Sequence, residues 1–293
     1  YLSRSPVRDD ATINFLGQQV PNPFYPLLPK TNLASTTVPR SQLLRPYPQF
    51  TGVSRNENVG YSWYHSMQVR LERRFTAGLS ASMSYTWSKL IDDASADGNA
   101  SPNPFDRSFN RGISNLDIPH RFVASFVYEL PRLSKQNMFM KQVLGGWDTN
   151  GIVVLQSGNP FTVVSGRDNS FSGVNADRAD LIGDPHLDTG RPHGQLVDRY
   201  FNIDAFTFNA VGTFGTAGRN ILRGPGNATV DFGLFKNFPL FETHRLQFRA
   251  EAFNLLNRVN LGNPNANRNA AAFGRITGAD SPRVIQLALK YQF

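Results

Sequence analysis

The sequence predicts an all-β protein, an antiparallel transmembrane β-barrel, and three observations support this. Apolar and polar side chains alternate over seven segments, the pattern of strands with two different environments on their faces. The segments run to about ten residues, which suits a tilted bilayer crossing, whereas strands of soluble sandwiches average nearer five or six. Shorter and longer connections alternate strictly along the chain, as in bacterial outer-membrane barrels.

The composition hides this pattern. The 293 residues are 40% hydrophobic with a mean hydropathy of −0.35, and no run approaches the roughly 18 consecutive apolar residues of a transmembrane helix. Averages of this kind erase alternation, because half of each strand is polar. The chain has no cysteine, which excludes a disulfide scaffold, a thiolate metal site and a cysteine nucleophile.

The clearest alternation lies in residues 66–75 and 79–88. Met67, Val69 and Leu71 share one face of the first segment, opposite Ser, Gln, Arg and Glu side chains. A three-residue link at 76–78, which contains Gly78, predicts a hairpin between the two segments.

Five further segments alternate in the same way: 120–130, 146–157, 230–238, 244–255 and 283–293. The second of these is weaker, since Ile152 and Val154 fall on its polar face. Lys236 is an exception on the apolar face of the third. We expect no amphipathic helix between the segments.

The links fall at 76–78, 91–119, 131–145, 158–229, 239–243 and 256–282. In an outer-membrane barrel the long links face outside and the short ones face the periplasm. The C-terminus is then periplasmic, and the Pro-rich residues 1–60 form an extracellular loop region. Residues 61–293 are expected to be the C-terminal strands and loops of a barrel. The first residue is Tyr1 and no signal-like segment follows it, so we expect a fragment of a longer protein.

Aromatic side chains are predicted to mark the two membrane interfaces as a girdle. The girdle residues are Phe75, Tyr85, Trp87, Phe122, Tyr128 and Trp147.

Charged side chains on the polar faces predict a ladder inside the barrel. Its members are Arg70, Glu72, Arg74, Arg245, Arg249 and Glu251. The net charge is +8, yet the basic residues are scattered without a nucleic-acid-binding motif, so no nucleic-acid partner is expected. Basic outer loops could instead meet the phosphates of lipopolysaccharide.

The last strand resembles the C-terminal assembly signal of outer-membrane proteins. The residues that carry this resemblance are Ile285, Leu287, Leu289, Tyr291 and Phe293. It implies recognition by the barrel-assembly machinery and residence in the outer membrane of a Gram-negative-type bacterium.

Further stretches resemble TonB-dependent receptors of the Oar-like type: LLRPYPQF at 43–50, YTWSK at 85–89, DIPHRF at 117–122, QSGNP at 156–160, LQFRAE at 246–251 and FNLLN at 253–257. The resemblance implies uptake of an unidentified ligand, with TonB contacted only through a plug region that is not recognisable here. Seven strands are about a third of the roughly 22 in a plugged transporter barrel. The chain is therefore expected to be the C-terminal part of such a barrel.

Two alternatives remain open at this stage. One is a structural or adhesive outer-membrane barrel without active transport. The other is a complete small barrel of eight strands, if residues 11–15 supply one more strand.

Enzyme chemistry is not expected. The five histidines show no H-E-x-x-H spacing and no serine lies in a nucleophile elbow. No catalytic residue, metal ligand or cofactor site is predicted.

Overall fold

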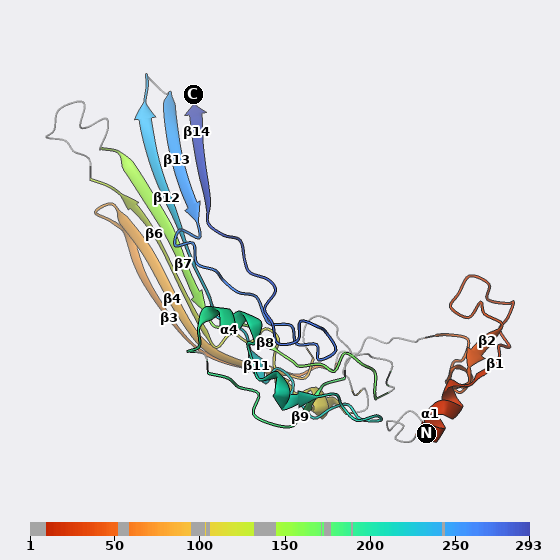
Figure 1. Cartoon of the computed structure of the whole chain (residues 1–293). Coiled ribbons are helices and arrows are strands. Elements are labelled where there is room, and N and C mark those ends of the chain that lie inside the picture. Colours follow the sequence, from red (N-terminus) through yellow and green to blue (C-terminus); the bar gives the residue numbers. More distant parts are fainter. Residues whose placement is uncertain are drawn as a thin grey trace.

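A long curved sheet dominates the computed structural model, with a folded cap of loops at one end (Figure 1). The structure describes residues 10–51, 59–94, 103, 106–131, 145–170, 172, 177–188, 190–241 and 244–293.

The sheet is an antiparallel meander in which each long strand pairs with the next along the chain. Its long strands are β3 (Ser62–Thr76), β4 (Leu79–Asp92), β6 (His120–Glu129), β7 (Trp147–Gln156), β12 (Asn227–Pro239), β13 (Arg245–Phe253) and β14 (Val284–Gln292). The short β5 (Gly112–Ile113) pairs with the end of β4. All seven segments that alternate in the sequence are therefore strands of one sheet. Within the described residues the sheet does not close into a barrel.

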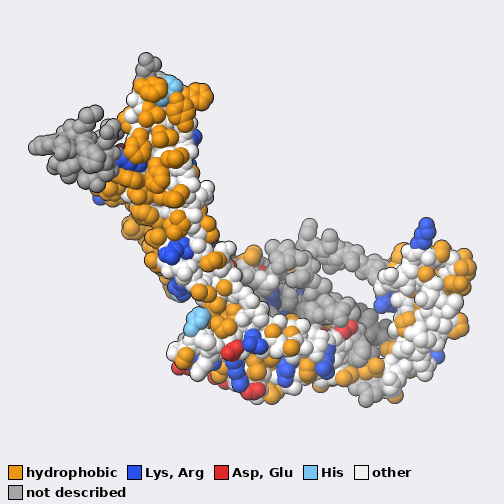
Figure 2. Space-filling model, turned by 45° about the horizontal axis from the view of Figure 1, so that its top comes forward, with side chains coloured by type: hydrophobic (Ala, Val, Ile, Leu, Met, Phe, Trp, Pro, Cys, Tyr) orange, Lys and Arg blue, Asp and Glu red, His pale blue; other side chains and the backbone are white. Residues whose placement is uncertain are grey.

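The strand register joins the apolar faces into one continuous surface. Tyr85 lies opposite Phe122, and Phe122 lies opposite Leu155 on the next strand. Directly paired residues point to the same side of a sheet, so apolar side chains of neighbouring strands meet. Figure 2 shows hydrophobic side chains spread over the arm that the sheet forms. Many are open to the surroundings; Leu287 is 68% exposed and Leu289 70%.

The hairpin between β3 and β4 is tighter than the sequence suggested. Thr76 pairs with Leu79, so the loop is the two residues Ala77 and Gly78 rather than three. Both have positive φ, 52° and 80°, as the right-handed twist of a two-residue hairpin requires. A Cβ at Gly78 would lie 2.7 Å from the carbonyl oxygen of Glu129.

The long connections 93–119, 157–226 and 254–283 gather at one end of the sheet, and the short links lie at the other (Figure 1). This arrangement confirms the alternation of links read from the sequence. Most of the link at 131–145 lies outside the described residues.

The long connections fold together as the cap. The cap contains η1 (Arg107–Asn110), β8 (Pro160–Phe161), β9 (Asp180–Leu181), α4 (His193–Asp198), η2 (Ile203–Ala205), β10 (Phe206–Thr207) and β11 (Leu222–Arg223). β8 pairs with β11 and β9 with β10, both antiparallel. α4 is a helix of six residues with none of them buried, so it does not test the expectation that no amphipathic helix lies between the strands.

The cap has a hydrophobic core of its own. Phe201 is its centre, with ring centroids 5.7 Å from Phe161, 5.7 Å from Phe206 and 5.3 Å from Phe273. The buried members of this core are Phe161, Val163, Ala179, Phe201, Ala205, Phe206, Ala217, Leu222 and Phe273. The contacts of Phe201 with Phe206 and Phe273 are edge-to-face and that with Phe161 is tilted, and such contacts favour one arrangement of the rings.

The N-terminal part forms a separate small unit of α1 (Asp10–Gly17), β1 (Gln19–Pro21), β2 (Thr37–Pro39) and α2 (Arg40–Leu43), with β1 paired to β2. Residues 11–15 are helical, so they supply no eighth strand and that route to a complete small barrel is wrong. The boundary near residue 60, between the extracellular loop region and the barrel strands, stays a prediction. No helix in the described ranges is both long and apolar enough to cross a bilayer.

Candidate functional site

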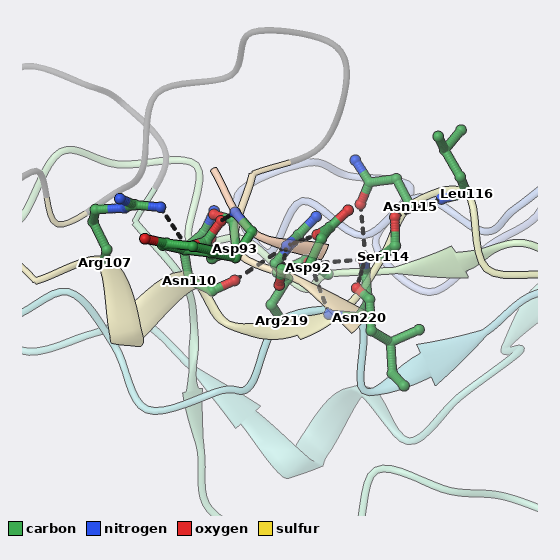
Figure 3. A network of polar contacts seen from close by, with 12 residues as sticks. Asp92, Asp93, Arg107, Asn110, Ser114, Asn115, Leu116, Arg219 and Asn220 are labelled. Atoms are coloured by element: carbon green, nitrogen blue, oxygen red, sulfur yellow. Dashed lines mark hydrogen bonds and ion pairs between the residues drawn. The ribbon is translucent and has the colours of Figure 1, made fainter. Parts of the chain in front are cut away.

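The rim where the cap meets the sheet holds a buried ion pair between Arg219 and Asp92. Asp92 ends β4, and Arg219 lies in the connection between β7 and β12. The guanidinium Nη1 lies 2.5 Å from Asp92 Oδ1, and the two side chains are 7% and 6% exposed. The same nitrogen donates to the carbonyls of Asp92 and Asn110, each at 3.1 Å (Figure 3). A buried charge is tolerated when it is paired and hydrogen-bonded in this way.

A second ion pair, Arg223 with Asp117, joins the same connection to the segment before β6. Nη2 lies 2.5 Å from Asp117 Oδ2, and Nη1 donates to the carbonyls of Asp117 and Gly158 at 2.8 Å. Asp117 Oδ1 also accepts from the backbone N–H of Leu90 on β4 at 2.6 Å. One buried carboxylate therefore ties the cap to both β4 and the start of β6.

Asn220 lies between the two arginines and binds a third element. Its Nδ2 donates to the carbonyl of Ile113 and to Asn115 Oδ1, both at 2.7 Å, as Figure 3 shows around Ser114 and Asn115. Its φ is 53°, a left-handed conformation in which Asn is enriched among non-glycine residues. The side chain and backbone of Asn220 together fix β5 to the cap.

Arg178 approaches the same network, and the described residues include no carboxylate in an ion pair with it. Its guanidinium lies 4.4 Å from the ring centre of Phe109, and Nη2 donates to Asn110 Oδ1 at 2.8 Å. Burial, together with the nearby charge of Arg219, lowers the pKa of Arg178 to about 10. Arg178 remains protonated at neutral pH and carries a desolvation cost.

A close backbone crossing completes the rim. A Cβ at Gly158 would collide with the carbonyl oxygens of Gly224 and Pro225. Only glycine, which has no Cβ, lets these two backbone segments approach so closely. The close approach of the two segments therefore explains the glycine in the QSGNP stretch at 156–160.

The described residues also line two hollows, one in the cap and one on the sheet away from the rim. One of about 330 Å³ lies in the cap and is lined by residues that include Phe109, Phe214 and Asp180. The Asp180 carboxylate accepts from the backbone N–H groups of Thr216 and Ala210.

The other hollow, of about 390 Å³, is a shallow trough that crosses the strands. Its polar lining residues are Ser80, Ser82, Ser125, Asn150, Asp231 and Glu251, and by strand register they lie on the polar face. Both hollows mix polar groups with a larger share of apolar lining. Among the described residues there is no group of three or more acidic, histidine or cysteine side chains that could hold a metal ion.

The expected charge ladder is placed in two separate groups. Arg70 and Glu72 form an exposed ion pair of 3.1 Å on β3. On β13, Arg249 Nε donates to Gln247 Oε1 at 2.7 Å. For Arg245, Arg249 and Glu251 the described part of the structure records no ion pair with one another. Arg74 lies where the β3–β4 register shifts, between Arg73 and Thr76, so the ladder itself stays a prediction.

Phe75, Phe122, Tyr128 and Trp147 of the expected girdle fall near the ends of their strands, whereas Tyr85 and Trp87 lie within β4, so the girdle stays a prediction. Tyr85 stacks on His120, with ring centroids 6.2 Å apart and the hydroxyl 2.8 Å from Nδ1. At the opposite end, Trp147 makes an edge contact with Phe248 at 6.3 Å. Phe75, Trp87, Phe122 and Tyr128 also lie on β3, β4 and β6.

Lys236, the exception on the apolar face, lies close to Trp147. Its Nζ is 4.9 Å from the Trp147 ring centre and donates to the carbonyl of Gly145 at 2.6 Å. The side chain is therefore satisfied within the protein, and this explains a cation among apolar neighbours.

Sequence reasoning missed the residues of the rim network. Asp92, Asp117, Arg219 and Arg223 lie where alternation stops, so periodicity says nothing about them. The available signal was an arginine pair spaced by Asn-Ile-Leu, together with an Asp at a strand end and another before a strand. That signal is weak, because Arg219 and Asp92 are 127 residues apart in the chain and Arg223 and Asp117 are 106 apart.

The long strands, the continuous apolar face and the polar opposite face define the wall of a transmembrane β-barrel. The sequence matches the family described as outer membrane beta barrel domain over residues 9–286, and the chain belongs to that family. It is accordingly a protein of the outer membrane. A search of curated proteins finds no match.

Proposed function

We propose that the chain is the C-terminal barrel segment of a TonB-dependent outer-membrane receptor that takes up a ligand. The observation that carries this proposal is the cap: long outer connections with their own core, anchored at the rim by the buried pair Arg219–Asp92 and by Arg223 paired with the buried carboxylate of Asp117. Binding sites are best supported on a rigid scaffold. The resemblance of several stretches to Oar-like receptors supplies the link to TonB. No catalysis is assigned to the chain.

The edges of the sheet support a larger barrel. Within the described residues β3 and β14 each pair with one long neighbour only. In lipid an open strand edge leaves N–H and C=O groups unpaired at a cost of several kcal/mol per group. The proposal therefore has further strands complete the wall in the membrane, and a wide barrel leaves room inside for a lining such as the trough.

Binding to TonB distinguishes a transporter from a structural or adhesive barrel. The intact natural protein in detergent is titrated with the purified periplasmic domain of TonB from the same bacterium. Saturable binding is expected, and it should disappear in a variant of the intact protein that lacks its TonB box. A protein with no TonB box, or without measurable binding, would be assigned to the structural or adhesive class.

The cap provides the second readout. Replacing residues 160–222 by a short Gly/Ser linker should leave TonB binding unchanged, because TonB acts from the periplasm. The same variant should lose uptake, measured as the solutes that cells remove from defined medium compared with the wild type. Unchanged uptake would contradict a binding role for the cap.

The terminal strand is proposed to carry the assembly signal. Deleting Phe293, which is 91% exposed, should reduce the amount of intact protein in the outer membrane several-fold. The matched control is deletion of one residue in the cap at Val211, which is also exposed. Heat-modifiable mobility on gels reports the folded barrel, and normal yields after the Phe293 deletion would refute the assignment.

A further inference from the structure

A cluster of exposed cations and aromatic rings lies on the apolar side of the sheet, at the end that carries the cap. Lys89 lies directly opposite His65 on the neighbouring strand. Two positions toward the sheet centre, Trp87 lies opposite His120. Arg111 reaches over Trp63, with its guanidinium 4.6 Å from the ring centre. We name these residues the rim patch: Trp63, His65, Trp87, Lys89, Arg111 and His120.

The rim patch faces away from the polar side. Paired residues share a face, and Lys89 has the same strand parity as Trp87, Tyr85 and Met83 of the apolar surface. Trp63 and Trp87 are 42% and 55% exposed, and the Lys89 and Arg111 residues are exposed as well. The cations therefore project outward, toward whatever surrounds the sheet.

The patch carries a net positive charge that nearby acids do not cancel. Asp93, which follows the end of β4, is paired with Arg107 at 2.5 Å and accepts from the Tyr61 N–H. Asp92 is buried against Arg219. Within the described residues no carboxylate forms an ion pair with Lys89 or Arg111.

The position of the rim patch along the strands matches the level of the lipid headgroups in the membrane. Trp87 and the stacked pair Tyr85–His120 belong at the interface, where amphipathic rings reside. Lys89 lies two residues farther out, about 7 Å along the strand. Arg111 lies farther out again along the same face, stacked on Trp63.

We propose that the rim patch binds the phosphate groups of lipopolysaccharide in the outer leaflet. The protein resides in the outer membrane, and the capped end carries the long connections that face outside in such barrels. The Arg111 guanidinium suits bidentate contact with a phosphate, and the Lys89 ammonium acts as a point charge beside it. This proposal is independent of transport, because it concerns the outer wall of the barrel and not its interior.

Lipid A titration of the intact protein in detergent, followed by native mass spectrometry, tests the proposal. The double variant Lys89→Gln/Arg111→Gln should bind lipid A roughly thirtyfold more weakly, from the loss of two surface charges. The matched control is Arg167→Gln/Lys290→Gln, which also removes one arginine and one lysine. Arg167 is likewise stacked on an aromatic ring, Phe208 at 3.7 Å, but within the cap. The control should stay within about twofold of the wild type.

Two lipid arms identify the source of the phosphate. The wild type should bind dephosphorylated lipid A as weakly as the double variant binds lipid A. It should bind phosphatidylglycerol more weakly than lipid A. Equal loss in the two double variants, retained binding in the rim variant, or equal affinity for phosphatidylglycerol would overturn the proposal.

Single variants keep the test decisive if the double variant does not assemble. Lys89→Gln should lower the affinity about fivefold, whereas Lys89→Arg should retain it. Heat-modifiable mobility verifies that both single variants are folded. Equal affinity in Lys89→Gln and Lys89→Arg would count against the rim patch.

Discussion

The sheet and the cap use the same kinds of side chain in opposite ways. In the sheet, apolar side chains are exposed, as with Leu287 at 68%, whereas in the cap Phe201 is 2% exposed. Charges show the reverse contrast: Arg70 and Glu72 on the sheet are open, and Arg219 and Asp92 at the rim are buried. One chain therefore folds in two environments, with lipid at the outer face of the sheet and water around the cap.

The contrast follows from what each region touches. The hydrophobic effect drives apolar side chains away from water, which gives the cap a closed core. Lipid is itself apolar, so the sheet's outer face gains nothing by closing on itself and relies on interstrand hydrogen bonds instead. Three predictions test this contrast, from the largest expected effect to the smallest.

Removing Arg219 should have the largest effect, confined to the cap. Arg219→Met leaves Asp92 buried without its partner, a change that typically costs about 3–5 kcal/mol. Hydrogen exchange should show faster exchange in the cap with the sheet still protected. The control Arg275→Met breaks an exposed pair with Asp198 at 3.1 Å, and it should change stability by less than about 1 kcal/mol.

A double variant separates the contribution of the ion pair from the cost of leaving one charge buried without its partner. Arg219→Met/Asp92→Leu removes both charges, and it should recover part of the stability lost in Arg219→Met. A double variant as unstable as the sum of the two single variants would mean that the ion pair does not anchor the cap.

A charge on the apolar face of the sheet should have the next largest effect, and only in lipid. Leu287→Arg near the middle of β14 should lower the free energy of unfolding in bilayers by roughly 2–4 kcal/mol. The control Gln286→Arg places the same charge on the polar face of the same strand and should be nearly neutral. Urea titration of the intact protein in phospholipid vesicles measures both; equal losses would show that the two faces share one environment.

The hairpin turn should give the smallest effect, with opposite sign. Ala77 has a φ of 52°, a conformation that costs a residue with a side chain roughly 1–2 kcal/mol. Ala77→Gly should stabilise the protein by about 0.5–1 kcal/mol, since the greater freedom of glycine in the unfolded chain offsets part of the gain.

The neighbouring position provides the control for the turn. Gly78→Ala should destabilise the protein, because its Cβ would lie 2.7 Å from the Glu129 carbonyl. Thermal unfolding of both variants measures the difference, and a loss of stability in Ala77→Gly would contradict the turn geometry.

The sequence predicted the sheet far better than the cap. Alternation at Met67, Val69 and Leu71 is local, so each strand could be found from its own residues. The cap depends on contacts such as Thr162 with Asn220, 58 positions apart, and such contacts leave no local pattern. The helix at residues 10–17 was missed for a related reason, since a segment of this length gives weak periodicity.

The sequence by itself determined the strands, their order and the face that each presents, because a period of two is a property of the extended chain. It also determined which links are long. Only the tertiary structure decided that those links fold into a cap, that Arg219 and Arg223 pair with Asp92 and Asp117, and that Arg111 stacks on Trp63, on the face of the sheet that carries Lys89. Those arrangements depend on chain segments that the strand register brings together, and the energy of a buried ion pair exists only once both partners have left water.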